Sequence, residues 1–133
     1  MKTRPMLTLE DCRKITAAAE AEAKKNNWNV CIAILDDGGH LLHLARMDGA
    51  SPANARIAVE KGRTAAESRR STLAWQERIK ARPELLNMPH ITPIQGGLPI
   101  MADGTCVGAI GISGVQSHED EQIAAAGIKA LTS

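Results

Sequence analysis

Aromatic side chains are almost absent from this chain of 133 residues, which has two Trp and neither Phe nor Tyr. Proteins that bind single-stranded nucleic acid stack bases on aromatic faces, so this shortage argues against such a function. Net charge is also nearly absent, because 16 Lys and Arg face 15 Asp and Glu and leave +1. Without a strong positive field, we expect no electrostatic binding to nucleic acid or to an anionic membrane.

Cysteines are few, and hydrophobic runs are short. Cys12, Cys31 and Cys106 are widely spaced, odd in number and in no CxxC pattern. This spacing predicts reduced, buried thiols rather than disulfides or a thiolate zinc site. No apolar run approaches the roughly 20 residues that a membrane span requires, and the first residues are polar rather than signal-like. We therefore expect a cytoplasmic protein without a membrane partner.

The remaining composition is that of an ordinary globular protein, with 44% hydrophobic and 23% charged residues. The length fits one domain over residues 1–133. No predicted strand is followed by G-x-G-x-x-G or by G-x-x-x-x-G-K-[ST], so the nucleotide-binding folds lose their main support.

Capping residues and periodicity predict four helices and several short strands. The last helix is expected to be capped by Ser117, with Asp120 three residues on. The predicted order is α-β-β-α-α-β-β-β-α, with hairpins joining successive strands, which indicates an α+β protein with an antiparallel sheet. The predicted helices cover about 9–25, 52–69, 71–80 and the residues after 117, and the clearest strands cover 30–35, 40–46, 98–101 and 105–113.

Lys61 is the most informative single residue. Ile57, Lys61 and Thr64 lie at i, i+4 and i+7, so the lysine shares the face of its helix that should pack inward. A buried ammonium is costly unless it is paired with a carboxylate or receives an anionic ligand. One interpretation is structural, with Lys61 reaching the rim or pairing with Asp48. The other is a site for a carboxylate or propionate.

Two groups of residues around Lys61 extend the second interpretation. Arg46 ends a strand, Asp48 follows in a loop, and Asn54 lies in the first helical turn, whose amides favour anions. Glycines around the last strand leave room for a flat ligand, although tight packing of a helix on the sheet explains them equally well. The predicted ligand-binding residues are Arg46, Asp48, Asn54, Lys61, Gly97, Pro99, Ser113 and Gly114.

No metal site is predicted. The segment 117–121 groups one imidazole with carboxylates, but adjacent helical residues diverge around the axis, so a capping box explains it better. His40 and His43 are expected on opposite faces of one strand and cannot share a metal. His90, in an irregular connection, is either a lone axial ligand or a surface imidazole.

Two series of motifs together resemble the GlcG/HbpS-like family over nearly the whole chain. The first is Ile34–Leu41, Arg46–Ala50 and then Ile57–Ala65. The second is Gly96–Ile100, Val107–Gly114 and then Asp120–Ala124. The resemblance implies a five-stranded antiparallel sheet flanked by helices, in a profilin-like layout similar to the carboxy-terminal domain of PduO-type proteins. It also implies homo-oligomers.

Members of that family include haem-binding or haem-degrading sensors and proteins encoded with catabolic enzymes. The first hypothesis is therefore a homo-oligomeric binding protein for haem or another small anionic metabolite, accessory to a catabolic pathway. The second is an isomerase or tautomerase acting on a carboxylate, with Lys61 as acid or base and Asp48 as its partner. The third is an accessory subunit without a ligand.

Overall fold

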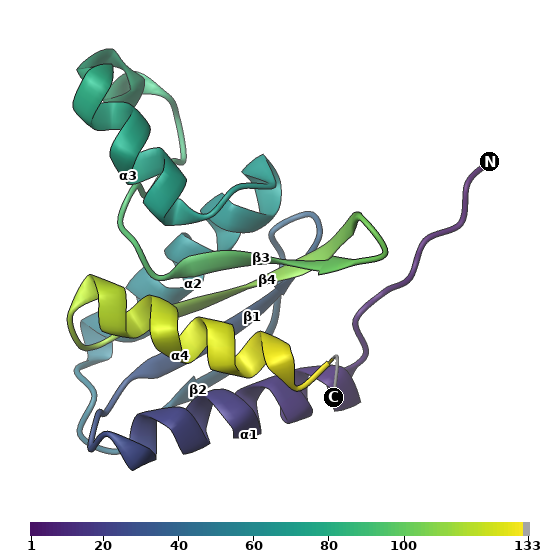
Figure 1. The fold of residues 1–133 in the computed structure, drawn as a ribbon, viewed down its shortest axis with the longest axis vertical. Coiled ribbons are helices and arrows are strands. Elements are labelled where there is room, and N and C mark those ends of the chain that lie inside the picture. Colours follow the sequence, from purple (N-terminus) through teal and green to yellow (C-terminus); the bar gives the residue numbers. More distant parts are fainter. Residues whose placement is uncertain (132–133) are drawn as a thin grey trace.

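One antiparallel sheet in the strand order β2-β1-β4-β3 organises the computed structural model, which describes residues 1–131 (Figure 1). The strands are β1 (Cys31–Asp36), β2 (Leu41–Arg46), β3 (Gly97–Ala102) and β4 (Thr105–Ser113). The helices are α1 (Leu9–Lys25), α2 (Pro52–Ser68), α3 (Thr72–Ala81) and α4 (Ser117–Lys129), with a 3-10 turn η1 (Pro83–Asn87).

The predicted α+β class and antiparallel pairing are confirmed, but the expected five strands are wrong. The described residues form four, because only two strands, β3 and β4, follow α3. The segment before β3 contains Pro89 and Pro93 and stays irregular. Proline cannot donate to a strand ladder, so this segment cannot add an inner strand.

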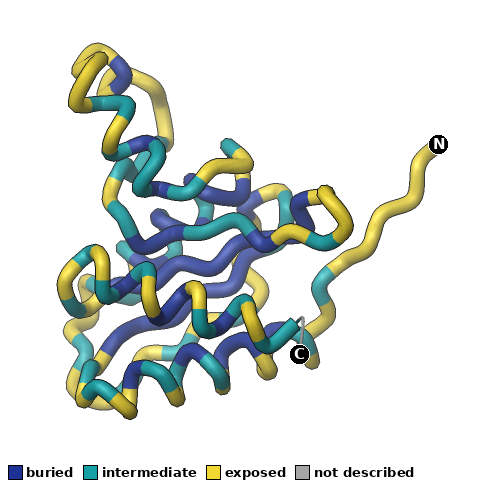
Figure 2. Tube along the Cα trace, in the orientation of Figure 1, coloured by how far each residue is buried: buried dark blue, intermediate teal, exposed yellow. Residues whose placement is uncertain are grey.

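The two faces of the sheet carry side chains of different size. Toward α1 and α4, β1 and β4 present isoleucines, among them Ile32, Ile34 and Ile110. Toward α2, the same strands present small side chains such as Ala33 and Ala109. The two central strands are buried on both faces (Figure 2). Without Phe and Tyr, the core is filled by branched aliphatic side chains on the α1 and α4 side. On the α2 side, the helix backbone lies close to the sheet.

Glycines set the distance between α2 and the sheet. A Cβ atom on Gly111 of β4 would lie 1.9 Å from the carbonyl oxygen of Ala58 on α2. A Cβ on Gly62 would lie 2.2 Å from a methyl carbon of Leu35. Of the two readings of the glycine-bearing strand, tight packing of a helix on the sheet is the one that these contacts support.

A bulge changes the predicted faces of the edge strand β2. Ile34 pairs with His43, but Leu35 pairs with Leu41, so Leu42 is the extra residue. Cross-strand partners share a face, which places Leu41 on the α2 side with Leu44. Strict alternation along the strand would put Leu41 and Leu44 on opposite faces, and the bulge reverses this alternation.

Helix α4 begins one residue earlier than its predicted cap implies. Gln116, not Ser117, is the N-cap, and its backbone N–H donates to the side chain of Glu119 at 3.1 Å. Asp120 is therefore not the capping acid. It lies one position further along and faces inward, 1% exposed.

The three cysteines are buried and free, as predicted. His40 contacts Asp36 in the β1–β2 turn, whereas His43 contacts Thr16 of α1. Within residues 1–131, no three His, Cys, Asp or Glu side chains gather as a metal site would require. The same residues include no helix with the length and apolarity needed to cross a bilayer.

Candidate functional site

Lys61 is buried, as its helical position predicts, and it forms an ion pair. Its side chain is 3% exposed, and its Nζ lies 3.0 Å from Oδ2 of Asp120 on α4. The same Nζ donates to the carbonyl oxygen of Ile112, also at 3.0 Å. The suggested partner Asp48 is wrong, because the carboxylate that meets the lysine comes from a helix on the opposite face of the sheet.

The other oxygen of Asp120 is also bonded, since Oδ1 accepts the backbone N–H of Val115 at 3.2 Å. Burial raises the pKa of the Asp120 carboxyl above its ordinary value, and the Lys61 ammonium offsets only part of this effect. The sequence does contain a signal for the burial of this residue. Asp120 lies three, four and seven positions before Ile123, Ala124 and Gly127, on the buried face of α4.

Glycines make room for the lysine rather than for a ligand. A Cβ on Gly96 would lie 2.8 Å from Nζ of Lys61, and a Cβ on Gly97 would lie 2.4 Å from its carbonyl oxygen. Gly114 differs, because it is exposed, although a Cβ on it would lie 2.7 Å from the carbonyl oxygen of Asn29. The space expected for a flat ligand beside Gly97 is therefore occupied by protein atoms, and a role for Gly114 stays a prediction.

Three of the predicted ligand-binding residues, Arg46, Asn54 and Ser113, lie at one end of the sheet. Cys31 pairs with Arg46 on one side and with Ser113 on the other, so Arg46, Cys31 and Ser113 form a row across β2, β1 and β4. The Ser113 hydroxyl donates to Oδ1 of Asn54, in the first turn of α2, at 2.8 Å. Pro99 lies apart from this row, on the edge strand β3 opposite Ala109.

A polar surface cavity of about 300 Å³ lies beside this row and includes Arg46 and Asp48. Its remaining walls come from Glu20, Lys24, Asn29 and Met47. Glu20 pairs with Lys24 at 3.4 Å, and Asp48 adds a further negative charge. The two carboxylates balance the charges of Lys24 and Arg46, so the cavity has no excess positive charge to attract an anion.

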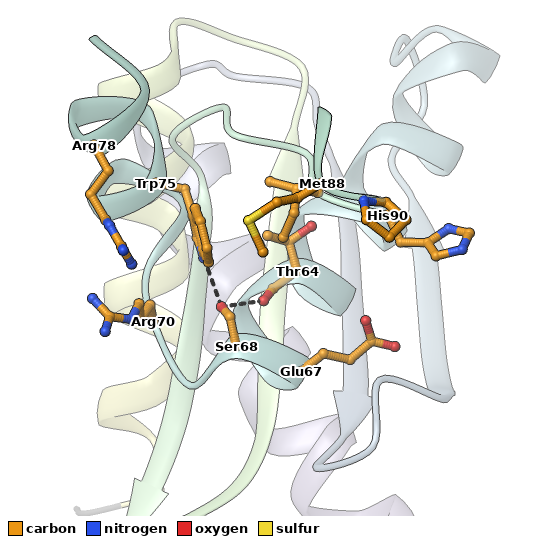
Figure 3. A pocket seen from close by; sticks show the side chains of 10 residues that line it. Thr64, Glu67, Ser68, Arg70, Trp75, Arg78, Met88 and His90 are labelled. Atoms are coloured by element: carbon orange, nitrogen blue, oxygen red, sulfur yellow. Dashed lines mark hydrogen bonds between the residues drawn. The ribbon is translucent and has the colours of Figure 1, made fainter. Parts of the chain in front are cut away.

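A second cavity, of about 360 Å³, was not predicted and has different walls (Figure 3). Trp75 of α3 and Met88 stand on opposite sides, with Ser68 of α2 between them (Figure 3). Arg70 and Arg78 lie together beyond the tryptophan (Figure 3). The lining is completed by Thr64, Glu67, Pro89, His90 and Ile91. We call it the Trp75 pocket.

Hydrogen bonds fix the walls of the Trp75 pocket. Trp75 is 6% exposed, and its indole Nε1 donates to Oγ of Ser68 at 2.8 Å. Ser68 in turn donates to the carbonyl oxygen of Thr64 at 2.6 Å. On the other wall, the backbone N–H of Thr92 donates to Oγ1 of Thr64 at 3.0 Å. The pocket is therefore built before any ligand arrives.

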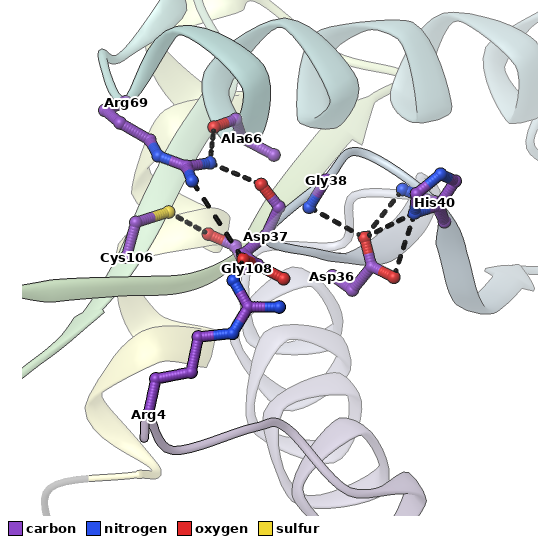
Figure 4. A network of polar contacts seen from close by, with 9 residues as sticks. All are labelled: Arg4, Asp36, Asp37, Gly38, His40, Ala66, Arg69, Cys106 and Gly108. Atoms are coloured by element: carbon purple, nitrogen blue, oxygen red, sulfur yellow. Dashed lines mark hydrogen bonds and ion pairs between the residues drawn. The ribbon is translucent and has the colours of Figure 1, made fainter. Parts of the chain in front are cut away.

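Arg69 ends α2 and precedes Arg70, which lines this pocket. It is the C-cap of α2 in the left-handed conformation, with φ 58°. Its guanidinium donates to the carbonyl oxygens of Asp37 and Ala66, and Asp37 also pairs with Arg4 (Figure 4). Ser71 then caps α3 by accepting the N–H of Ala74 at 3.1 Å. Arg70 is thus held between two fixed residues.

Fold and pockets together define a small α+β protein with a four-stranded sheet and a preformed pocket next to α3. The family described as haem degrading protein HbpS-like matches residues 7–129. The chain belongs to this HbpS-like family.

Relatives agree with this assignment. Protein GlcG of Escherichia coli is 46% identical over 114 residues, which cover 85% of each chain. A crystal structure of a double mutant of Streptomyces reticuli HbpS has a TM-score of 0.91 and 33% identity, covering 98% of this chain and 90% of that one. A PduOC:heme complex has a TM-score of 0.86 and 25% identity, covering 95% of each. The family resemblance read from the motifs is confirmed.

Proposed function

We propose that this protein binds haem, or another small anionic metabolite with a flat apolar body, in the Trp75 pocket. The observation that carries the proposal is the combination of an apolar wall, formed by Trp75 and Met88, with two arginines at the rim. The family and the PduOC:heme complex support haem as the first ligand to test. The three free, buried thiols support a cytoplasmic location.

The residues of the pocket fit haem by their chemistry. Trp75 and Met88 offer apolar and polarisable surface to a macrocycle. Arg70 and Arg78 offer hydrogen-bond donors to its propionates. Met88 and His90 carry a thioether sulfur and an imidazole, both of which coordinate haem iron in proteins. When bound, haem would supply redox or oxygen chemistry, while this chain supplies the wall, the charge and the ligand atoms.

Titration of hemin into the purified protein is expected to give a saturable shift of the Soret band. Met88→Glu should weaken binding about tenfold or more, because it buries a carboxylate against the ring. Leu86→Glu is the matched control, since Leu86 is exposed on the same connection but does not line the pocket. Absence of a saturable shift in the wild-type protein would refute the haem proposal.

A separate proposal is that Arg46, Asn54 and Ser113, at the end of the sheet, bind the anion. One variant distinguishes this site from the Trp75 pocket. Arg46→Gln removes the charged member of the row without touching the Trp75 pocket. If haem binds in the Trp75 pocket, this variant should bind as the wild type does. A loss in Arg46→Gln together with normal binding by Met88→Glu would instead favour the sheet-end residues Arg46, Asn54 and Ser113.

Self-association is the second part of the proposal, with a second copy of this chain as the partner. Within residues 1–131, no strand pairs with the outer side of β2, and Leu41, Leu42 and Leu44 are exposed on it. The backbone N–H and C=O groups on an open edge can pair with another strand, and three exposed leucines add apolar surface to such an interface. Two copies related by a two-fold axis would pair β2 with itself in an antiparallel, self-complementary interface.

Light scattering coupled to gel filtration measures this association. The wild-type protein is expected at a multiple of the 14.2 kDa chain mass. Leu44→Lys should shift it toward the single chain, because a charge on the edge opposes strand pairing. Leu86→Lys, another exposed leucine outside β2, should not. A wild-type mass of one chain would refute the association.

A further inference from the structure

Two arginines at the rim of the Trp75 pocket have no acidic partner. Among residues 1–131, no carboxylate forms an ion pair with Arg70 or Arg78. Their neighbours in sequence differ, since Arg63 pairs with Glu60 and Glu67, and Arg69 pairs with Asp37. Within the described part of the chain, the positive charge at the rim is therefore not neutralised by a carboxylate.

Both arginines line the Trp75 pocket. Figure 3 shows both on the same side of the Trp75 ring, although one comes from the α2–α3 link and the other from α3. Arg78 lies over the indole, with Cζ 4.9 Å from the ring centroid. This stacking orients its planar fork. Arg70 is positioned by the flanking caps at Arg69 and Ser71.

Resting on the proposed function, we infer that Arg70 and Arg78 form a carboxylate clamp and that the pocket selects its ligand by carboxylates on a planar ring, not by iron. Arginine forks match carboxylate geometry with two parallel hydrogen bonds. The ring of such a ligand lies toward Trp75 and Met88, and its acid groups reach the rim. Glu67 also lines the pocket, but it is paired with Arg63 and therefore does not neutralise Arg70 or Arg78. The ligand class is a planar ring with carboxylate groups, and a metal-free porphyrin belongs to it.

The test compares three probes: hemin, metal-free protoporphyrin IX and protoporphyrin IX dimethyl ester. Binding is followed by the Soret absorption of each and, for the two metal-free rings, by their fluorescence anisotropy. The wild type is compared with Arg70→Gln/Arg78→Gln. Arg56→Gln is the control, because Arg56 is exposed on α2 and lies outside the pocket. Circular dichroism checks that each variant folds.

We expect the wild type to bind hemin and the metal-free acid, and to bind the diester about tenfold more weakly or worse. In the double variant, the affinity for the acid should fall by a similar factor, and the preference for acid over ester should disappear. Arg56→Gln should behave as the wild type. Equal affinity for acid and ester, or unchanged binding by the double variant, would overturn the clamp.

The outcomes separate the clamp from the haem proposal. Hemin binding that does not depend on the two arginines overturns the clamp and leaves haem binding standing. Arginine-dependent binding of the metal-free acid without hemin binding supports the clamp and removes haem as the ligand. Binding of neither acid overturns both.

Discussion

Lys61→Met is expected to destabilise the fold by about 3–5 kcal/mol at pH 7, because it leaves the Asp120 carboxylate buried without its counter-charge. The pair is almost fully enclosed, with side chains 3% and 2% exposed. Met matches the lysine stem in length, so lost packing contributes little. Chemical denaturation monitored by circular dichroism measures the change.

The loss should shrink as the pH falls. Burial already raises the pKa of Asp120, and removing Lys61 raises it further. A folded-state pKa above the unfolded value means that the folded protein holds a proton that the unfolded chain releases. Stability of the variant therefore falls as the pH rises from about 4, the unfolded pKa, through the folded pKa. Denaturation at pH 4.5 and 7 should show the smaller defect at pH 4.5.

Two further variants isolate the cause. Lys61→Met/Asp120→Leu removes both charges and should recover most of the lost stability, since an apolar replacement of a buried pair is often neutral. Lys80→Met breaks an ion pair with Glu77 that is largely exposed, so it should cost less than about 1 kcal/mol. A double variant as unstable as Lys61→Met would contradict the unpaired-charge explanation.

Gly111→Ala is the second substitution with a large expected effect, of about 3 kcal/mol or more. Its new Cβ would lie 1.9 Å from the carbonyl oxygen of Ala58 and 2.6 Å from the backbone nitrogen of Gly62. Both are backbone atoms of α2, so a rotamer change cannot relieve the contact and the helix itself must move. Thermal unfolding should show a much lower midpoint, or no folded protein.

Thr105→Ala is the control for this substitution, because Thr105 is an exposed residue of the same strand. It should change stability by less than about 0.5 kcal/mol. A Gly111→Ala protein with wild-type stability would show that α2 does not lie as close to β4 as the structure places it.

Patterns of neighbouring residues predicted most helices and strands of this fold. The predictions that were wrong failed because of a bulge or a shifted cap. The hairpins, the cap of α1 and the start of α2 after Ser51 follow from residues adjacent in sequence. The bulge at Leu42 and the cap at Gln116 each displaced a prediction by one residue. A one-residue shift is enough to reverse the face of a strand residue or to turn an acid inward.

The site was harder to predict, because its parts are distant in sequence. Helical spacing predicted that Lys61 is buried, but its partner lies 59 residues away, and no local pattern joins α2 to α4. The Trp75 pocket draws on α2, α3 and the connection after η1. Its walls meet only when the chain folds back on itself, so neither Trp75 nor the arginine pair stood out in the sequence.

The unequal faces of the sheet also bear on how the sequence can change over time. On the isoleucine side, branched and unbranched aliphatic side chains can replace one another as long as their total volume is kept. On the α2 side, small residues bring the helix close to the sheet, and an atom added at Gly111 meets the helix backbone itself. Substitutions should therefore accumulate beneath α1 and α4, while the surface beneath α2 stays nearly invariant among functional variants of this chain.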